Sequence, residues 1–228
     1  MKVPNSIGVI IDGNRRWAKG KGLSSIEGHK AGKDRLKDCV LWAKEAGVKS
    51  AVVYVFSTEN WKRAEEEVSY LFDLIRIAFH QEKDFWKDEN IKIKFAGQIE
   101  RLPEDLQGYL KEVEEETKER DGFLLVIAIS YGGRAEIVEA AKRFAQAPKE
   151  VQEGVDEGNF GQFLWTAGVP DPDLVIRTGG EKRLSNFLLW QIAYSELFFC
   201  DTLWPDFSKE EFLKILEEYS ERDRRHGK

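Results

Sequence analysis

The chain has 228 residues, of which 42% are hydrophobic and 33% are charged, and its formal net charge is -6. This composition is typical of one globular domain, and the sequence predicts a single domain over residues 1–228. The acidic balance argues against a nucleic-acid-binding protein. Two isolated cysteines exclude a disulfide framework, and no apolar stretch is long enough to cross a bilayer, so we expect a cytoplasmic protein.

Short apolar runs alternate along the chain with longer segments of helical spacing. The predicted strands are 7–11, 51–56, 91–96, 123–130, 174–176 and 197–200, and the predicted helices are 30–46, 65–87, 103–120, 134–147 and 208–224. Residues 147–172, with scattered glycine and proline, are expected to form loops around a short helix. This alternation predicts an α/β fold in which a mainly parallel six-stranded sheet is flanked by helices on both faces.

The first predicted strand leads into the segment GVIIDGNRRWAKGKG, residues 8–22. Asp-Gly favours a hairpin when alternating apolar residues flank it on both sides, but here only the upstream side is apolar. From Asp12 to Arg35, basic residues outnumber acidic residues by seven to three. A basic island on an acidic protein suits a small polyanion such as a phosphate ester.

The predicted helix 65–87 carries two apolar stripes. The first stripe is Val68, Leu71, Phe72, Ile75 and Phe79, and the second is Tyr70, Leu74 and Ile77. An amphipathic helix needs only one such stripe, so we expect this helix to be buried on two sides. Either it lies between the sheet and another subunit, or one stripe lines an apolar cavity.

Polar clusters follow four of the predicted strands: residues 12–17, 57–63, 131–134 and 177–185. Parallel sheets bind ligands at the carboxyl ends of their strands. Glycine lets backbone N–H groups approach an anion, and the arginine fork matches phosphate oxygens, so the clusters together predict a phosphate site. The dinucleotide and P-loop glycine patterns are both missing from the sequence.

Asp12 is the acidic residue of the first cluster and has two candidate roles. It could hold Mg²⁺, which proteins bind through one or two carboxylates together with substrate phosphates. Alternatively, it resembles the nucleophile of haloacid-dehalogenase phosphatases. That alternative requires a second aspartate where this chain has Asn14.

The motifs IIDGNRRWAKGKG, EGHKAG, YVFSTENWKR, ISYGGR and VIRTGGEKRLSNFLLWQIAYSELFF occur in this order. Together they resemble the cis-prenyltransferases, the undecaprenyl diphosphate synthase family, over nearly the whole chain. The resemblance implies a homodimeric, Mg²⁺-dependent enzyme that condenses isopentenyl diphosphate onto an allylic diphosphate such as farnesyl diphosphate. It also implies an apolar tunnel for the growing chain, a polyprenyl product of undecaprenyl type, and peripheral membrane contact for product release.

The resemblance also assigns roles to individual residues. Asp12 would be the catalytic carboxylate and a metal ligand, Asn60 would accept the proton, and Glu196 would help hold the metal from across the dimer interface. The allylic diphosphate would be bound by Gly13, Asn14, Arg15, Arg16, Trp17 and His29. Ser57, Thr58, Glu59, Trp61 and Arg63 would wall the reacting carbons, and Arg177, Arg183, Leu184 and Ser185 would bind isopentenyl diphosphate.

This chain departs from the family pattern at Ser25, where an arginine that binds the diphosphate is usual. Lys21 or Arg15 is expected to compensate. Val55 stands where many members have a smaller residue, so the product is expected to be shorter if Val55 faces the tunnel. Glu67 is expected to be only a helix-start carboxylate. A non-catalytic subunit of a heteromeric prenyltransferase remains an alternative, although such subunits typically lack the aspartate present here as Asp12.

Overall fold

The computed structural model describes residues 2–222, so the ends of the predicted domain and of the predicted helix 208–224 lie outside the described residues. One sheet runs in the order β3-β4-β2-β1-β5-β6, and every neighbouring pair is parallel. Its strands are β1 (Ser6–Ile10), β2 (Ser50–Ser57), β3 (Ile91–Ala96), β4 (Phe123–Tyr131), β5 (Leu174–Arg177) and β6 (Glu196–Phe199). The predicted six-stranded α/β fold is confirmed.

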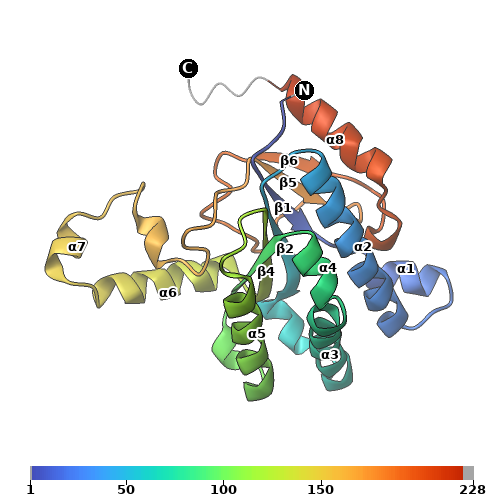
Figure 1. Cartoon of the computed structure of the whole chain (residues 1–228), viewed down its shortest axis with the longest axis horizontal. Helices are drawn as coiled ribbons and strands as arrows, with labels where there is room; N and C mark the ends of the chain where they lie inside the picture. Colours follow the sequence, from blue (N-terminus) through green and yellow to red (C-terminus); the bar gives the residue numbers. More distant parts are fainter. Residues whose placement is uncertain (1, 223–228) are drawn as a thin grey trace.

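Alternate residues of the central strands face two separate cores. Val9 and Val53 belong to the larger core, which packs against helices on one face of the sheet (Figure 1). These helices are α2 (Ser25–Glu45), α3 (Glu65–Gln81), α4 (Lys83–Asp88), α5 (Glu104–Thr117) and α8 (Lys209–Glu221). Val52 belongs to the smaller core, whose partners outside the sheet come from mainly non-helical chain between Trp165 and Ile192. The helical cover is therefore uneven, unlike the prediction of helices on both faces.

Two predicted helices have different bounds in the structure. Helix α2 begins at Ser25 rather than at residue 30, because Ser24 and Glu27 form a reciprocal capping box at its start. The predicted helix 65–87 breaks at Glu82 into α3 and α4. The break turns Trp86 back, so that its ring is buried and its Nε1 donates to the carbonyl of Ala78 at 3.1 Å.

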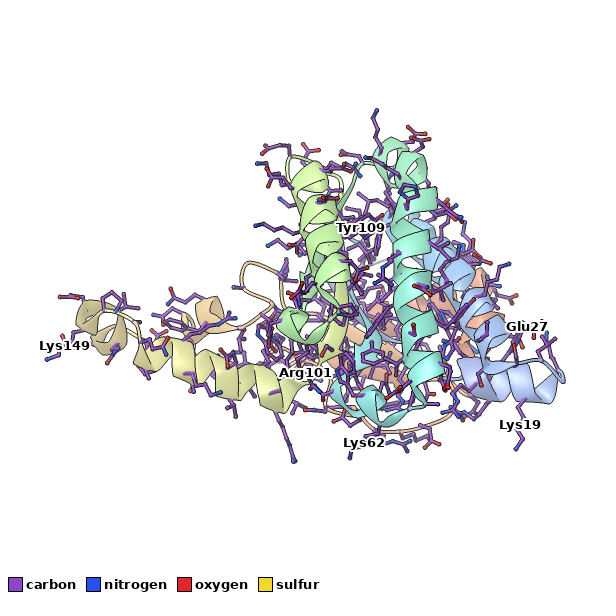
Figure 2. All side chains as sticks on the ribbon, turned by 90° about the horizontal axis from the view of Figure 1, so that it is seen from below. Lys19, Glu27, Lys62, Arg101, Tyr109 and Lys149 are labelled. Atoms are coloured by element: carbon purple, nitrogen blue, oxygen red, sulfur yellow. The ribbon has the colours of Figure 1, made fainter. Side chains whose placement is uncertain are left out.

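The segment after β4 forms an arm. Helix α6 (Gly133–Ala145) projects away from the sheet and carries α7 (Lys149–Glu153) near its far end, while α1 (Asn14–Gly20) lies at the opposite end of the molecule (Figure 2). The short 3₁₀ helix η3 (Phe160–Phe163) then leads back to β5. This confirms the prediction of loops around a short helix. Among the described residues, no helix is long and apolar enough to span a membrane.

Strand β1 lies between β2 and β5. Strand β2 is the next strand along the chain, whereas β5 begins only at Leu174. The strand order therefore changes direction at β1, and such a switch point opens a crevice beyond the carboxyl ends of the strands. The register pairs Ile10, the last residue of β1, with Arg177, the last residue of β5. This pairing brings the first and fourth polar clusters to the same crevice.

Candidate active site

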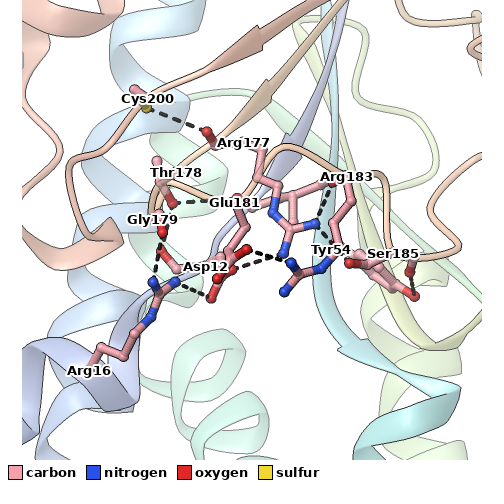
Figure 3. A network of polar contacts seen from close by, with 11 residues as sticks. Asp12, Arg16, Tyr54, Arg177, Thr178, Gly179, Glu181, Arg183, Ser185 and Cys200 are labelled. Carbon is pink, nitrogen blue, oxygen red and sulfur yellow. Dashed lines mark hydrogen bonds and ion pairs between the residues drawn. The ribbon is translucent and has the colours of Figure 1, made fainter.

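Asp12 lies at the centre of the crevice, just beyond β1. Its Oδ2 accepts from Arg177 Nη2 at 2.9 Å, and its Oδ1 pairs with Arg16 Nη2 at 3.1 Å (Figure 3). Arg16 also donates through Nη1 to the carbonyl of Gly179 at 2.7 Å, and Thr178 Oγ1 donates to the Asp12 carbonyl at 2.7 Å. Three of these polar contacts therefore join the first and fourth clusters.

Arg177 is buried, with only 4% of its side chain exposed. Its Nη1 donates to the carbonyl of Arg183 and to Ser185 Oγ, the latter at 2.7 Å. Its Nε is also buried and has no hydrogen-bond partner among the described residues. Three contacts therefore hold the guanidinium in place at the wall of the crevice.

Helix α1 reaches the crevice because two glycines of α2 let it approach. A Cβ added at Gly28 would lie 2.3 Å from the carbonyl oxygen of Asn14, and one added at Gly32 would lie 2.4 Å from Asn14 Oδ1. Real Cβ atoms do not approach this closely, so Gly28 requires glycine because its neighbour is backbone, whereas a Cβ at Gly32 would displace the Asn14 side chain. The sequence alone did not predict α1, which is only seven residues long and follows Gly13.

Glu67 connects three site residues, which corrects the expectation that it is only a helix-start carboxylate. Its Oε1 lies 3.2 Å from His29 Nε2, 3.1 Å from Arg63 Nη1 and 3.8 Å from Arg15 Nε. Burial lowers the pKa of His29, and nearby Arg63 adds to this, while the hydrogen bond that the His29 ring makes to the Glu67 carboxylate acts in the opposite direction. The i, i+4 spacing of Arg63 and Glu67 was the only sequence signal for this network.

A basin of about 1260 Å³ opens at this edge of the sheet. Most of the predicted site residues line it: Asp12, Gly13, Asn14, Arg15, Arg16, His29, Ser57, Glu59, Asn60, Arg63, Arg177, Arg183 and Ser185. Lining residues that sequence reasoning missed include Lys19, Leu23, Ser24, Tyr54 and Asn186. Ser25, which replaces the usual arginine, also lies in the wall.

The two predicted tryptophans lie outside the basin lining. Trp17 donates through Nε1 to Asp206 at 2.7 Å, and Lys21 Nζ sits 4.3 Å from the centroid of its ring. Lys21 is therefore not among the lining residues, whereas Arg15 is, so the structure favours Arg15 as the residue that compensates for Ser25. Trp61 packs against the larger core and donates through Nε1 to Ser130 Oγ at 2.9 Å.

Three other predicted residues are also outside the lining. Thr58 Oγ1 donates to Oε2 of Glu59, a residue of the basin wall, at 3.2 Å. Leu184 packs against the smaller core. Glu196 is the first residue of β6 and accepts from Arg222 Nη1 at 2.6 Å. It pairs in register with Leu174, at the opposite edge of the sheet from Asp12. Within one chain, Glu196 and Asp12 do not share a site.

The glycine pairs of the third and fourth clusters have a different role from the expected anion binding. Gly133 N–H donates to the carbonyl of Asn186, Gly179 N–H to that of Thr202, and Gly180 N–H to that of Cys200. These donors are therefore occupied by the protein itself. Arginine side chains, rather than glycine N–H groups, dominate the anion-binding character of the basin.

Adjoining the basin is a narrow apolar slot of about 70 Å³, and a continuous tunnel for a growing chain stays a prediction. Ile11, Asn14, His29 and Val55 line both cavities. The contribution of α3 to the slot is Leu71, Leu74, Ile75, Ala78 and Phe79, which form a single stripe at 3, 4, 7 and 8 spacing. The predicted second stripe contributes only Leu74, because Ile77 is exposed.

An arginine-rich basin beside an apolar slot defines a protein that binds an amphiphilic phosphate ester. Residues 10–227 match the family model described as putative undecaprenyl diphosphate synthase. An isoprenyl transferase of Thermotoga maritima is 47% identical over 231 residues, which cover 100% of this chain and 98% of that protein. The chain belongs to the undecaprenyl diphosphate synthase family, and it is a prenyltransferase that carries out cis-prenyl chain elongation.

Solved structures agree with this assignment. The crystal structure of lavandulyl diphosphate synthase from Lavandula x intermedia, in complex with dimethylallyl diphosphate, has a TM-score of 0.91 and 35% identity, and the match covers 99% of each chain. A probable undecaprenyl diphosphate synthase from Campylobacter jejuni has a TM-score of 0.83 and 34% identity over 100% of both chains. The phosphatase alternative is excluded by this family membership.

Proposed function

We propose that the basin holds two diphosphates on either side of Asp12. Arg15, Arg16 and His29, with the α1 backbone at Gly13 and Asn14, would bind the allylic diphosphate. Arg177, Arg183 and Ser185 would bind isopentenyl diphosphate. The observation that carries this proposal is the contact between Asp12 and Arg177, two residues 165 positions apart, beside a narrow slot with an apolar lining.

The reaction forms a carbon–carbon bond between the two substrates, breaks the bond between the allylic carbon and its diphosphate, and releases a proton. Negative charge grows on the departing pyrophosphate, and prepositioned arginines stabilise it. Asn60 is our candidate for the group that receives the proton. Its Oδ1 accepts the Ser57 N–H at 3.0 Å, which fixes the side chain in the basin wall.

Mg²⁺ is the cofactor that we propose, and the donor set is compatible with it. Among residues 2–222, no cluster of three or more histidine, cysteine or acidic side chains could hold a metal ion by itself. Mg²⁺ is often bound by a single carboxylate together with substrate phosphates and water, and Asp12 supplies that carboxylate. When bound there, the cation would neutralise the charge on the leaving diphosphate. Glu196 could join it only from a second copy of the chain.

We further propose that the enzyme is a cytoplasmic homodimer with a product of undecaprenyl type. The arm supports dimerisation, because α6 projects from the body and Val138 on it is 56% exposed. The slot favours a hydrocarbon substrate, because each buried CH₂ contributes about 0.8 kcal/mol. Exposed Leu23 and Ile26 lie near the basin mouth, beside Lys19 and Lys30, and would suit peripheral membrane contact during product release.

Incubation with farnesyl diphosphate and labelled isopentenyl diphosphate tests the proposal, with and without Mg²⁺. We expect labelled long-chain lipid from the wild-type protein only when Mg²⁺ is present, and none from the variant Asp12→Ala. Phosphate release from simple monoesters serves as a negative control. Elongation by Asp12→Ala at the wild-type rate would contradict the role given to this carboxylate.

A further inference from the structure

Asn186 follows Ser185 and contacts two of the other polar clusters. Its backbone carbonyl accepts the Gly133 N–H at 2.7 Å, and its Oδ1 accepts the Arg134 N–H at 2.9 Å. Its Nδ2 donates to Glu59 Oε1 at 3.2 Å. One residue therefore joins the loop of the fourth cluster to the second and third clusters.

The contact with α6 replaces a local helix cap. The first N–H groups of a helix need acceptors from outside the helix. The N-cap residue of α6 is Gly132, which has no side chain to provide one. Asn186 provides two acceptors from 52 residues further along the chain. A Cβ at Gly132 would lie 2.7 Å from Asn186 Nδ2, and one at Gly133 would lie 2.9 Å from Leu189. The glycine pair of the YGGR motif thus makes room for this loop.

The loop around Asn186 needs such external support. Asn186 has φ 67°, Ser185 has φ 50° and Leu188 has φ 44°, all in the left-handed region. Asparagine tolerates this conformation, but for other non-glycine residues it persists only where surrounding contacts enforce it. At the start of this loop, the Arg183 carbonyl and the Ser185 Oγ are the two acceptors that orient Arg177 Nη1.

The partner of the Asn186 amide is an ionised carboxylate. Partial burial raises the pKa of Glu59, but hydrogen bonds from its own backbone, Ser57, Asn186 and Thr58 outweigh this and leave it below its usual value. The Nδ2 to Oε1 bond is therefore charge-assisted, which makes it stronger than a neutral hydrogen bond. It ties the isopentenyl side of the basin to the wall formed by the second cluster.

We propose that Asn186 is a positioning residue that holds the Arg183–Ser185 loop in the geometry required for isopentenyl diphosphate. This inference rests on the proposed assignment of Arg177, Arg183 and Ser185 to that substrate. Asn186 acts through these neighbours, so its loss should weaken one substrate selectively. The allylic side, built from α1 and α2, does not depend on it.

Two variants and a control test the inference. Asn186→Gly keeps the left-handed backbone and the carbonyl bond but removes both side-chain bonds. Asn186→Asp keeps an acceptor for the Arg134 N–H but places a carboxylate against Glu59. Asn90→Gly is the matched control, because Asn90 also has a left-handed φ of 51° and donates to an acid, Asp121 at 2.9 Å, away from the basin.

For Asn186→Gly we expect KM for isopentenyl diphosphate to rise about tenfold, with KM for farnesyl diphosphate within about twofold of wild type. Asn90→Gly should change neither KM. In Asn186→Asp, KM for isopentenyl diphosphate should rise at least as much. Adding Glu59→Gln should lower this KM part of the way back, because the glutamine amide can donate to the new carboxylate. A purely structural role would raise both KM values alike.

Calorimetric titration with isopentenyl diphosphate gives the same comparison without turnover. Equal affinity of wild type and Asn186→Gly would overturn this inference while leaving the proposed function intact. Equal increases in both KM values, or strictly additive effects when Asn186→Asp and Glu59→Gln are combined, would also overturn it. A wild-type protein that does not bind isopentenyl diphosphate would overturn the proposed function together with the inference.

Discussion

Substituting Gly28 by alanine should displace α1 and with it the allylic side of the basin. The new Cβ would lie 2.3 Å from the Asn14 carbonyl oxygen and 2.9 Å from Ala18 Cβ, and the first of these neighbours is backbone. Contacts below 3.0 Å are not sustained, so α1 must move outward by at least about 0.7 Å. A displacement near 1 Å of a substrate-positioning element can cost about 100-fold in rate.

We therefore expect kcat/KM for the allylic diphosphate to fall about 100-fold in Gly28→Ala, together with an overpacking cost of about 1–3 kcal/mol in unfolding free energy. Steady-state kinetics and urea unfolding measure the two effects separately. Gly108→Ala is the matched control, because Gly108 is also helical and has nothing within 4 Å of an added Cβ. It should keep full activity and gain up to about 1 kcal/mol. A Gly28→Ala enzyme with wild-type kinetics would refute the argument that glycine is required for α1 to approach α2.

Three further predictions follow from individual contacts. Because burial and Arg63 lower the pKa of His29 below its usual 6.5, the unfolded chain binds a proton before the folded protein does. The free energy of unfolding should thus fall as pH decreases below about 6.5, and His29→Asn should reduce this slope in urea titrations. Val55 lines both the basin and the slot, so Val55→Ala should shift the product ladder towards longer chains, and an unchanged ladder would contradict this. Lys19 lines the basin whereas Lys21 stacks on Trp17, so Lys19→Ala, but not Lys21→Ala, should raise KM for the allylic diphosphate severalfold; equal effects would show that the tail of α1 is placed differently.

Local patterns were sufficient to predict the sheet. A central strand of a buried parallel sheet is a nearly continuous apolar run, so β4, where all but one of the residues from Phe123 to Tyr131 are buried, stands out in the sequence. The edge strand β3 instead alternates Ile91 and Ile93 with lysines, which is the period of a strand with one buried face. Helix boundaries were less predictable, because they depend on single side chains. The capping box at Ser24 starts α2 early, and the burial of Trp86 interrupts the predicted helix 65–87.

The residue types of the site were predictable, but the contacts between them were not. Glycine and arginine after parallel strands indicated a phosphate site, and Asp12, Arg16 and Arg177 do meet there. Glu67 and Asn186 were missed as organising residues, because most of their partners lie tens of residues away in the sequence and only Arg63 is a near neighbour of Glu67. No helical or strand periodicity records that Asn186 caps a helix 52 residues earlier.

The arginines of the basin are paired with carboxylates before substrate binds. The pairs differ in how readily a substrate phosphate could take the place of the carboxylate. Glu67 is only 14% exposed and has three basic partners, so releasing it would leave a buried charge unpaired at high cost. Asp12 is 29% exposed beside the buried Arg177, and Glu181 and its partner Arg183 are both exposed, at 40% and 60%. Phosphate oxygens can therefore replace these two carboxylates at Arg177 and Arg183 while Glu67 keeps its partners. We therefore expect that Asp12, which contacts Arg177 in the free enzyme, would become available for the proposed Mg²⁺ once a diphosphate is bound.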